Sequence, residues 1–545
     1  MFTLTDDERA ISDTARDFAS EYLAPNAIEW DQTKHFPVDV LRKAGSLGMG
    51  GIYISEDVGG SGLTRLDAVR IFEQLAKGCP SIAAYVSIHN MVTWMIDSFG
   101  TDEQRHQWVP ALASMEHLGS YCLTEPGAGS DAAALSTKAV RDGNDYLLTG
   151  VKQFISGAGT SDVYVVMART GSAGAKGISA FIVPKGAEGL SFGANEKKMG
   201  WNAQPTRQVI LDEVRVPAAN LLGQEGDGFR IAMSGLNGGR LNIAACSVGG
   251  GQAALQKAVN HLAERKAFGS PLLDSQALQF QLADMRTELE AARTLLWRAA
   301  AALDEDANDK VELCAMAKRF ATDTGFDVAN KALQMHGGYG YLSEYGLEKI
   351  VRDLRVHQIL EGANEIMRVV IARSVVGTAG QRERGRSGGD RGGGDRRQAR
   401  RPRPAHPEPA QGDQRAQPLD GAPARGGAGG MGRRRRGARG GAHRRGGARA
   451  LRRRRHRLDL PRRPGRRRRL ARVLARRVRA QRRDRELPQA VRRDHGRHRD
   501  GRRRRGVRAR QRPDRHRALD DRNARGRNRI RARCGRHLPA LACPG

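Results

Sequence analysis

The sequence predicts an α+β fold made of an N-terminal helical domain, a middle antiparallel β domain and a C-terminal helical bundle of the four-helix type. Helix signals dominate residues 1–118, and short strand-like runs separated only by turns occupy 119–222. After that, apolar residues recur at steps of four and three, which is typical of long helices that pack side by side. The bundle is therefore expected over 223–380.

A capping box begins the first predicted helix. The side chains of Thr5 and Glu8 can each accept a hydrogen bond from the other residue's backbone N–H. Apolar residues at helical spacing follow, namely Ile11, Ala15, Phe18 and Tyr22. Pro25 ends this pattern, and Pro37 opens a second short helix. Further helices are expected over 66–77, 81–99 and 101–112.

After Gly119 the sequence pattern changes from helices to short strands. Strand-like runs occur at 146–148, 163–167, 178–183 and 208–211, with glycine and proline turns between them. Because no helices separate these runs, we expect an antiparallel barrel or sandwich rather than a doubly wound sheet.

Helices return at Gly228. The clearest apolar seam consists of Leu278, Leu282, Met285, Leu289, Ala292, Leu296 and Ala299. A second long helix is expected over 311–336. A last helix is predicted after Asn364, which we expect to cap it, and Gly377 is expected to end it.

Charge divides the chain into two kinds of sequence. The whole chain of 545 residues carries a formal net charge of +34. Residues 381–545 contain 57 Arg, no Lys and 14 acidic residues, so this segment alone carries +43, whereas residues 1–380 carry −9. The segment contains no Phe, Tyr or Trp, and we therefore expect a disordered Arg-rich tail.

Two interpretations of the tail stay open. An arginine-rich segment can bind nucleic acid through its charge, which would make the chain a nucleic-acid-binding protein. Arg, Gly, Ala and Pro all have GC-rich codons, however, so a GC-rich gene translated out of frame would give the same composition. We favour the out-of-frame interpretation, because evolved basic tails usually mix Lys with Arg.

The cysteines predict neither a metal site nor a disulfide framework. Six of them are scattered without paired spacing, so we expect a reducing compartment. The sequence shows no signal peptide at its start and no apolar run of about 20 residues. These observations predict a cytoplasmic protein without a membrane span.

Glu361 is the candidate base. It lies between the apolar pair Ile359 and Leu360 and the glycine Gly362, just before the last predicted helix. Apolar neighbours raise the pKa of a carboxyl group and make its anion a stronger base. Taken alone, this stretch favours a solvated loop glutamate.

A glycine-rich loop opens the middle domain. Residues 121–131 read Tyr-Cys-Leu-Thr-Glu-Pro-Gly-Ala-Gly-Ser-Asp, which offers hydroxyl groups and free backbone N–H groups to a polar cofactor or phosphate. The loop lacks the glycine spacings of the dinucleotide-binding and Walker motifs. A loop with ordinary turn chemistry remains an alternative.

Six motifs occur in the order and spacing of the acyl-CoA dehydrogenases, so residues 1–380 resemble that family. The motifs are Tyr121–Asp131, Phe154–Ser156, Asn237–Arg240, Arg265–Gly269, Gln334–Gly338 and Glu361–Glu365. The resemblance implies FAD as the cofactor, electron-transfer flavoprotein as the electron acceptor and a homotetramer. It does not extend to residues 381–545.

The resemblance also implies which residues bind the cofactor. Those expected near the flavin and its ribityl chain are Tyr121, Cys122, Leu123, Thr124, Gly129, Ser130, Phe154, Ile155 and Ser156. Those expected to reach the FAD of a neighbouring subunit are Arg265, Ser275, Gln276, Gln334, Met335, His336, Gly337 and Gly338. Ala363, Asn364 and Glu365 would close over the adenine-nucleotide part.

The resemblance names Glu361 as the base that removes the α-proton of the acyl-CoA. The residues expected to bind the acyl-CoA are Ser130, Asn237, Gly238, Gly239, Arg240 and Arg373. Some branches of the family carry the base just before the arginine that matches Arg240. Here that position is Gly239, which has no carboxylate, so Glu361 is the remaining candidate.

The expected function is the α,β-dehydrogenation of a short branched acyl-CoA. The resemblance is strongest to the branch that acts on isobutyryl-CoA. Oxidation of isobutyryl-CoA is a step of valine degradation. A butyryl-CoA or 2-methylbutyryl-CoA specificity stays open, because one methylene changes binding in an apolar pocket by only about 1–3 kcal/mol.

Overall fold

The computed structural model describes residues 4–387, with side chains described as far as residue 377. The first six α-helices are α1 (Asp6–Phe18), α2 (Ala27–Thr33), α3 (Val38–Ser46), α4 (Arg65–Gly78), α5 (Pro80–Phe99) and α6 (Asp102–Ala113). The capping box at Thr5 is confirmed, since Thr5 Oγ1 accepts from the Glu8 N–H and Glu8 Oε2 accepts from the Thr5 N–H. The α2 helix was not predicted; a π-helical turn over Ala19–Leu23 leads toward it.

The middle part of the chain is an eight-stranded sheet. Its strands are β1 (Gly119–Cys122), β2 (Lys138–Asp142), β3 (Asp145–Ser156), β4 (Val163–Arg169), β5 (Ile178–Pro184), β6 (Leu190–Phe192), β7 (Thr206–Pro217) and β8 (Leu221–Leu222). Their order is β6-β7-β3-β2-β4-β5-β8, and β1 branches off to pair with β4. Most pairings are antiparallel as predicted, but β1 lies parallel to β4, and a single parallel bridge joins β2 to β4.

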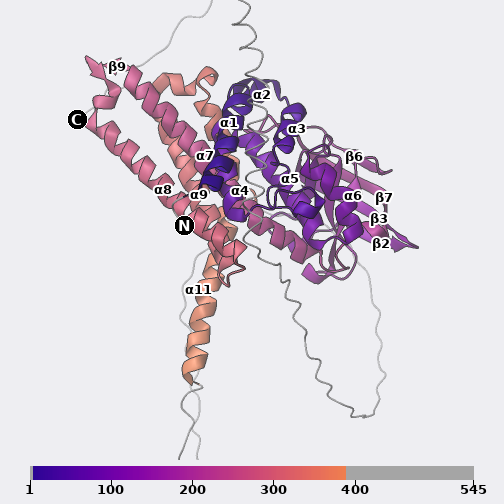
Figure 1. Ribbon diagram of the computed structural model, residues 1–545. Coiled ribbons are helices and arrows are strands. Elements are labelled where there is room, and N and C mark those ends of the chain that lie inside the picture. The colour runs from indigo at the N-terminus through magenta and orange to yellow at the C-terminus, as the bar shows by residue number, and fades with distance from the viewer. Residues whose placement is uncertain (1–3, 388–545) are drawn as a thin grey trace, which may run out of the picture. The chain divides into compact units, whose positions relative to one another are not determined.

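Strands β4 and β5 are buried on both faces, which explains their continuous apolar sequences. Val163, Val165 and Met167 pack in one cluster with Met91 and Met95 of α5. The alternate residues of these strands pack in a second cluster with residues of β3 and β7. The sheet therefore rests directly on α5, and Figure 1 shows its β2, β3, β6 and β7 strands gathered beside α5 and α6.

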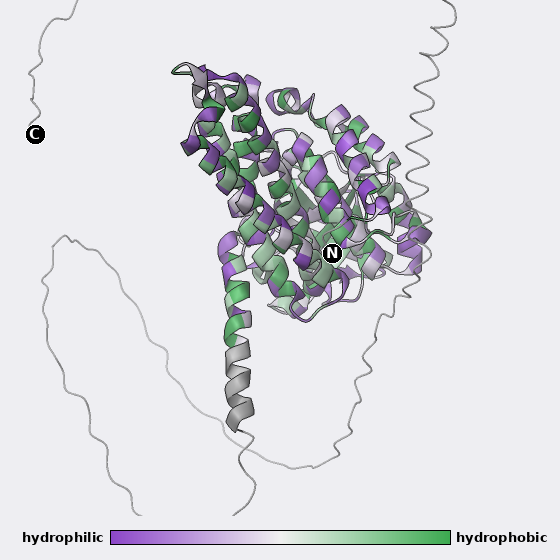
Figure 2. Cartoon of the chain, turned by 60° about the vertical axis from the view of Figure 1, so that its left-hand side comes forward, coloured by the Kyte–Doolittle hydropathy of each residue, from purple (hydrophilic) through white to green (hydrophobic). Residues whose placement is uncertain are grey.

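The C-terminal part is a bundle of long helices. They are α7 (Gly228–Glu264), α8 (Gln276–Asp304), α9 (Lys310–Met335), α10 (Leu347–Arg355) and α11 (Asn364–Ser387), and a short hairpin of β9 (Lys266–Ala267) and β10 (Ser270–Pro271) links α7 to α8. The predicted seam on α8 is confirmed at Met285, Leu289 and Leu296, which are buried. In Figure 2 hydrophobic residues gather where the helices meet. None of the helices within 4–387 is both long and apolar enough to cross a membrane.

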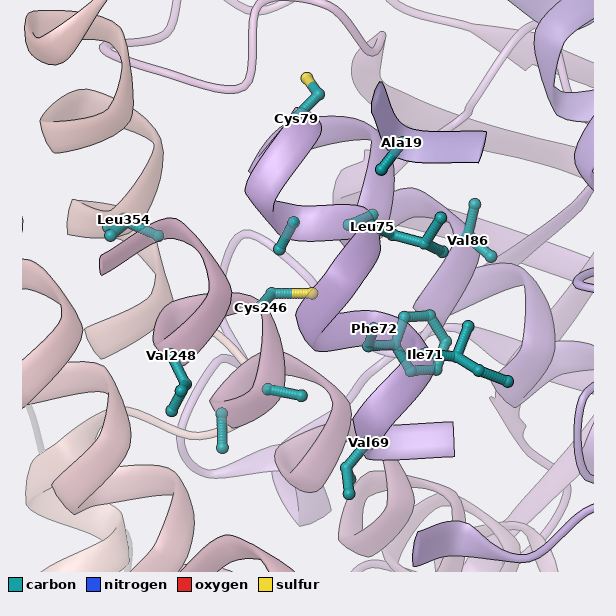
Figure 3. Close-up of a cluster of buried hydrophobic side chains, with 14 of the residues drawn as sticks. Ala19, Val69, Ile71, Phe72, Leu75, Cys79, Val86, Cys246, Val248 and Leu354 are labelled. Carbon is teal, nitrogen blue, oxygen red and sulfur yellow. The ribbon is translucent and has the colours of Figure 1, made fainter. Parts of the chain in front are cut away.

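Helices α4 and α7 pack closely at the centre of the molecule. Phe72 and Leu75 of α4 and Cys246 and Val248 of α7 belong to one buried cluster, drawn in Figure 3. Gly249 permits this approach, because a Cβ at that position would lie 2.2 Å from the Glu73 carbonyl oxygen. The long helix α7 thus connects the N-terminal helices to the bundle, and it also passes the candidate base.

Two predictions about the last helix are wrong. Asn364 is its first residue and does not cap it with its side chain, which is bonded to α9 instead. The helix also continues past Gly377 to Ser387, because no proline follows and residues such as Gln381 and Glu383 favour helix. The predicted disordered tail therefore cannot begin at 381. Its remainder, 388–545, lies outside the described residues.

Candidate active site

The backbone of the Glu361 loop is held by two helices. Glu361 has φ of 57°, an unfavourable value for a residue with a side chain, and Gly362 has φ of 90°. Lys318 of α9 donates from Nζ to the Gly362 carbonyl oxygen at 2.8 Å. Arg240 of α7 donates from Nε to the Glu361 carbonyl oxygen at 3.2 Å. These two cations fix the loop in a conformation that the chain would otherwise avoid.

Glu361 is half-buried, and one of its carboxylate oxygens is shielded and available. Its Oε2 is shielded from solvent and has no hydrogen-bond partner among residues 4–387. Burial raises the pKa of this carboxyl to about 7, against the opposing charges of Arg240 and Lys318. A carboxyl group with such a pKa is an effective base near neutral pH, because it is partly ionised and also strongly basic.

Two consecutive glycines of α7 make room for two charged side chains. A Cβ at Gly239 would lie 2.6 Å from Glu361 Oε2, and a Cβ at Gly238 would lie 2.4 Å from Arg65 Nη1. The guanidinium of Arg65 lies over the Tyr53 ring, with its Cζ 3.5 Å from the ring centroid. The predicted motif Asn237–Arg240 therefore lies against the candidate base, where Arg240 also donates to Asn237 Oδ1 at 2.8 Å.

A polar network fastens the start of α11 to α9. Asn364 Oδ1 accepts from Lys318 Nζ at 2.9 Å, and Asn364 Nδ2 donates to Asp323 Oδ1 at 2.7 Å and to Thr322 Oγ1 at 3.0 Å. Asn364 is therefore buried and its side chain is engaged within the chain. Ala363 is half-buried and Glu365 is exposed, so of the three predicted adenine contacts Glu365 has the side chain most open to solvent.

Tyr121 faces the same buried space. Its hydroxyl is shielded and lacks a hydrogen-bond partner in the described part of the chain. Burial raises the pKa of Tyr121 well above its usual value, and the negative charge of Glu361 raises it further. Tyr121 lies on β1, whose parallel pairing with β4 brings the start of the glycine-rich loop toward α7. The first and last of the six motifs thus meet at one place.

The glycine-rich loop is anchored by a buried ion pair. Glu125 Oε1 lies 2.7 Å from Lys152 Nζ, and the same carboxylate accepts hydrogen bonds from the backbone N–H groups of Ser136 and Thr137. Burial alone would raise the pKa of Glu125, but these contacts, led by Lys152, hold it at about 2. The carboxylate therefore stays ionised and keeps the loop in one shape.

The tip of this loop leaves backbone open to a ligand. No atom lies within 4 Å of a Cβ built on Gly127 or Gly129, and Ser130 is exposed. Thr124 is half-buried, whereas Cys122 and Leu123 are buried and turn into the core. Cys122 and Leu123 can therefore contact a cofactor only through their backbone.

Phe154 on β3 has an unusual backbone conformation and an exposed side chain. Its backbone has φ of 60° where the pairing of β3 with β7 shifts register, and 64% of its side chain is exposed. A large aromatic side chain held outward by strained backbone suggests a contact surface for a flat ligand. Ile155 points the other way into the core, and Ser156 is half-buried.

The second set of predicted cofactor residues lies at one end of the bundle. Exposed side chains or backbone there belong to Arg265, Ser275, Gln276, Gln334, Gly337 and Gly338. Met335 and His336 are buried instead, and His336 stacks on His261 with ring centroids 4.4 Å apart. Arg265 lies over the Tyr339 ring at 5.6 Å. Arg373 is exposed on α11. No contact within the described chain joins this set to Glu361.

The residues present fit a large polar cofactor beside the base. Glu361 Oε2 and the Tyr121 hydroxyl are buried and unpartnered within 4–387, and the open glycines 127 and 129 offer backbone N–H groups. Chemically, the arrangement can bind a polar group on the loop and remove a proton with Glu361 from a substrate lying against α7.

Sequence reasoning missed two buried cations and one buried ion pair of the site. Lys318 and Arg65 lie on helices, where a single charged residue is normally predicted to be exposed to solvent. Both side chains are nevertheless buried. The Glu125–Lys152 pair joins residues that are far apart in sequence. The available signal was the charge itself, since Lys318 directly follows the apolar stretch Cys314–Ala317.

Comparisons with known proteins show which proteins this chain resembles. Three family models match: "Acyl-CoA dehydrogenase, N-terminal domain" over residues 5–116, "Acyl-CoA dehydrogenase, middle domain" over 120–214 and "Acyl-CoA dehydrogenase, C-terminal domain" over 226–376. Isobutyryl-CoA dehydrogenase, mitochondrial, from Bos taurus is 56% identical over 373 residues, which cover 68% of this chain and 90% of that protein.

Solved structures show the same fold. Butyryl-CoA dehydrogenase from Megasphaera elsdenii is 37% identical, with a TM-score of 0.67 over 69% of this chain and all of that one. A glutaryl-CoA dehydrogenase from Mycobacterium smegmatis, solved in complex with FADH2, is 28% identical, with a TM-score of 0.65 over 69% of this chain and 95% of that one. The last of the three family-model matches ends at residue 376, before the Arg-rich segment.

Proposed function

Because this chain belongs to the acyl-CoA dehydrogenase family, we propose that it converts a short branched acyl-CoA to the 2,3-enoyl-CoA with Glu361 as the base. The observation that carries the proposal is the shielded Oε2 of Glu361, which has no partner within residues 4–387 and lies on a loop fixed by Lys318 and Arg240. A thioester α-proton is weakly acidic, so its removal requires a desolvated base with a raised pKa.

In the proposed reaction the α-proton passes to Glu361 Oε2. The backbone N–H of Glu361 donates to the thioester carbonyl oxygen and stabilises the negative charge that develops there. Bound FAD supplies the two-electron acceptor for the β-hydride, which no side chain could supply. Lys318 and Arg240 hold the loop so that carboxylate and N–H keep their positions during the proton transfer.

We propose that FAD lies along the glycine-rich loop and Phe154. The open backbone at Gly127 and Gly129 and the exposed Ser130 support this placement. Arg265, Ser275, Gln276 and the Gln334–Gly338 turn lie at the far end of the bundle and would contact the cofactor of a neighbouring subunit, which requires an oligomer. The exposed valines of α11, Val369, Val375 and Val376, support a contact with another copy.

The proposed substrate is isobutyryl-CoA, and the valine pathway is its proposed context. The support is the 56% identity to the Bos taurus isobutyryl-CoA dehydrogenase. The acyl-CoA would lie along α7 with Asn237–Arg240 and Arg373 toward its CoA portion. A panel of isobutyryl-, 2-methylbutyryl- and butyryl-CoA with a dye acceptor tests this. The largest kcat/KM is expected for isobutyryl-CoA, and a larger value for butyryl-CoA would refute this specificity.

The proposed electron acceptor is electron-transfer flavoprotein. The proposed oligomeric state is a homotetramer. If Arg265 contacts cofactor across a subunit boundary, Arg265→Ala should lose FAD and partly dissociate on gel filtration. An Arg265→Ala protein that remains a yellow tetramer would contradict this placement. The cytoplasmic location also stays a proposal, since the Bos taurus relative carries "mitochondrial" in its name. Imaging of the tagged full chain in its own cells would test it.

A further inference from the structure

Trp201 has an unusual backbone for a large buried residue. Its φ is 55°, in the left-handed region that favours glycine, and only 5% of its surface is exposed. A residue persists in such a conformation only where its surroundings fix it, and strained residues of this kind gather at functional sites. Trp201 lies in the segment between β6 and β7, so it belongs to the middle part of the chain.

Three contacts fix Trp201 against the end of α10. Its backbone N–H donates to Asp353 Oδ1 at 2.6 Å, and Arg352 Nη1 donates to the Met199 carbonyl oxygen at 3.0 Å. Gly200 allows the close approach, since a Cβ there would lie 2.5 Å from the Arg352 carbonyl carbon. Asp353 is in turn paired with Lys349 at 2.6 Å. The backbone around Trp201 is therefore held in place.

The indole belongs to a small apolar cluster next to the base. Ala84 of α5, Trp201 and Ile243 of α7 form its buried centre, and Ile88, Val356 and Leu360 pack against it. Leu360 directly precedes Glu361 in the chain. The cluster therefore begins one residue from the candidate base.

One face of α7 gives the order of these groups. Residues 239, 243 and 247 are four apart, so they lie one above another on the helix, about 6 Å apart. Gly239 faces the Glu361 carboxylate, and Ile243 packs in the Trp201 cluster. Ser247 Oγ bonds His357 Nδ1 at 2.8 Å, and the His357 ring packs edge-on to Trp201 at 5.5 Å. Trp201 thus lies about one helical turn beyond the base.

We propose that Trp201 is the end wall of the acyl pocket and sets its short length. This inference rests on the function proposed above. An acyl group whose α-carbon lies at Glu361 and whose CoA portion lies toward Asn237 must extend its alkyl end along α7 toward Ile243. The indole then leaves room for only a few carbon atoms. A short branched acyl group fits this space, and a longer chain meets the ring.

His357 supports the wall without adding charge to the pocket. Burial and the nearby Lys318 lower the pKa of His357 to about 3, so the ring is neutral at physiological pH. The apolar cluster then offers the alkyl end of the substrate no charged group on this side. The other wall residues, Ala84, Ile88 and Ile243, are too small to close the pocket if the indole is removed.

The test shortens Trp201 and measures chain-length preference. Trp201→Leu and the milder Trp201→Phe are assayed with isobutyryl-CoA and hexanoyl-CoA. The kcat/KM ratio of hexanoyl-CoA to isobutyryl-CoA should rise at least tenfold in Trp201→Leu and less in Trp201→Phe, because each added methylene in an apolar pocket changes discrimination by about 10–200-fold. The matched control is Trp30→Leu, which removes another buried tryptophan, on α2, and should leave the ratio unchanged.

Binding without turnover gives a second measurement. In a Glu361→Gln background, calorimetry should show hexanoyl-CoA binding at least tenfold tighter after Trp201→Leu, with little change for isobutyryl-CoA. If both ratios stay within twofold while the wild type oxidises isobutyryl-CoA, the wall assignment is wrong and the proposed function stands. If the wild type oxidises no acyl-CoA, the proposed function fails and this inference fails with it. Should Trp201→Leu not fold, the same ratios in Trp201→Phe decide, with a rise of threefold as the threshold.

Discussion

The carboxylate of Glu361 fills the space in which a side chain at Gly239 would begin. A Cβ at Gly239 would lie 2.6 Å from Oε2, 2.9 Å from Cδ and 3.1 Å from Oε1 of Glu361. The two positions are far apart in sequence, yet only one of them can place atoms at this point. With the Glu361 side chain in this position there is no room for a Cβ at 239, and the same space is reachable from α7.

Gly239→Ala should reduce activity with little loss of stability. The added methyl would push the end of a flexible side chain, so the helix itself can stay in place, but the carboxylate must move. A displacement of about 1 Å at a reacting group can cost about 10²-fold in rate. We expect kcat to fall at least tenfold, with the thermal midpoint changed by a few degrees at most. Stopped-flow reduction and thermal melting measure the two effects.

Gly235→Ala is the matched control for that substitution. It adds a methyl to the same buried helix, but the nearest atom is Cε of the flexible Met95 side chain, 2.1 Å away. It should cost at least as much stability and leave kcat within a factor of three. Equal losses of kcat in both variants would mean that general disturbance of α7, not the displaced carboxylate, accounts for the effect.

Removing the charge of Lys318 should raise the pH at which the enzyme becomes active. Glu361 must be ionised to accept a proton, so kcat/KM should rise as pH increases through about 7. The charge of Lys318 lowers this pKa. Lys318→Met should therefore move the rise to higher pH. It should also lower kcat, since the Gly362 carbonyl oxygen loses its donor. pH profiles of kcat/KM check both effects.

Lys318→Arg keeps the charge and should leave the midpoint of the profile near that of the wild type. Burial lowers the pKa of Lys318 to about 8, opposed by Glu361, so the wild-type effect should fade above that pH. Unchanged profiles in Lys318→Met would show that the lysine only supports the loop mechanically.

A chain ending at Ser387 should keep full specific activity. The last of the three family models ends at residue 376, and every residue assigned to the site lies at or before Arg373. Removing 388–545 also removes most of the positive charge, so binding to nucleic acid should disappear. Activity assays and salt-dependent retention on immobilised DNA compare the two chains. An inactive shortened chain beside an active full-length one would make the Arg-rich segment part of the enzyme.

The helices and most strands could be predicted from the sequence because their signals are local. The capping box at Thr5 and the seam on α8 depend on residues within a few turns of each other. The parallel pairing of β1 with β4 could not be predicted, since it joins segments about forty residues apart and leaves no mark on spacing. The predicted end of α11 was wrong because a single glycine, Gly377, weakens a helix without ending it.

For the proposed site, the motifs point to Glu361 but not to the residues packed around it. Lys318, Trp201 and Arg65 contact distant parts of the chain, and each has the local sequence of an ordinary helix or loop residue. The positive φ of Trp201 is also invisible in sequence, since nothing but the folded contacts with Asp353 and Arg352 imposes it. The positions of these side chains depend on long-range packing, which local sequence patterns do not reveal.

The central claim is that Glu361 is the base, and the reductive half-reaction of Glu361→Gln tests it most directly. The variant keeps the shape of the side chain and the loop contacts through Lys318 and Arg240. It should therefore bind FAD and isobutyryl-CoA with unchanged affinity, while flavin reduction, followed by loss of the yellow absorbance, should slow by about 10²–10⁴-fold or more. Flavin reduction at a tenth of the wild-type rate or faster, with both ligands bound, would contradict the account.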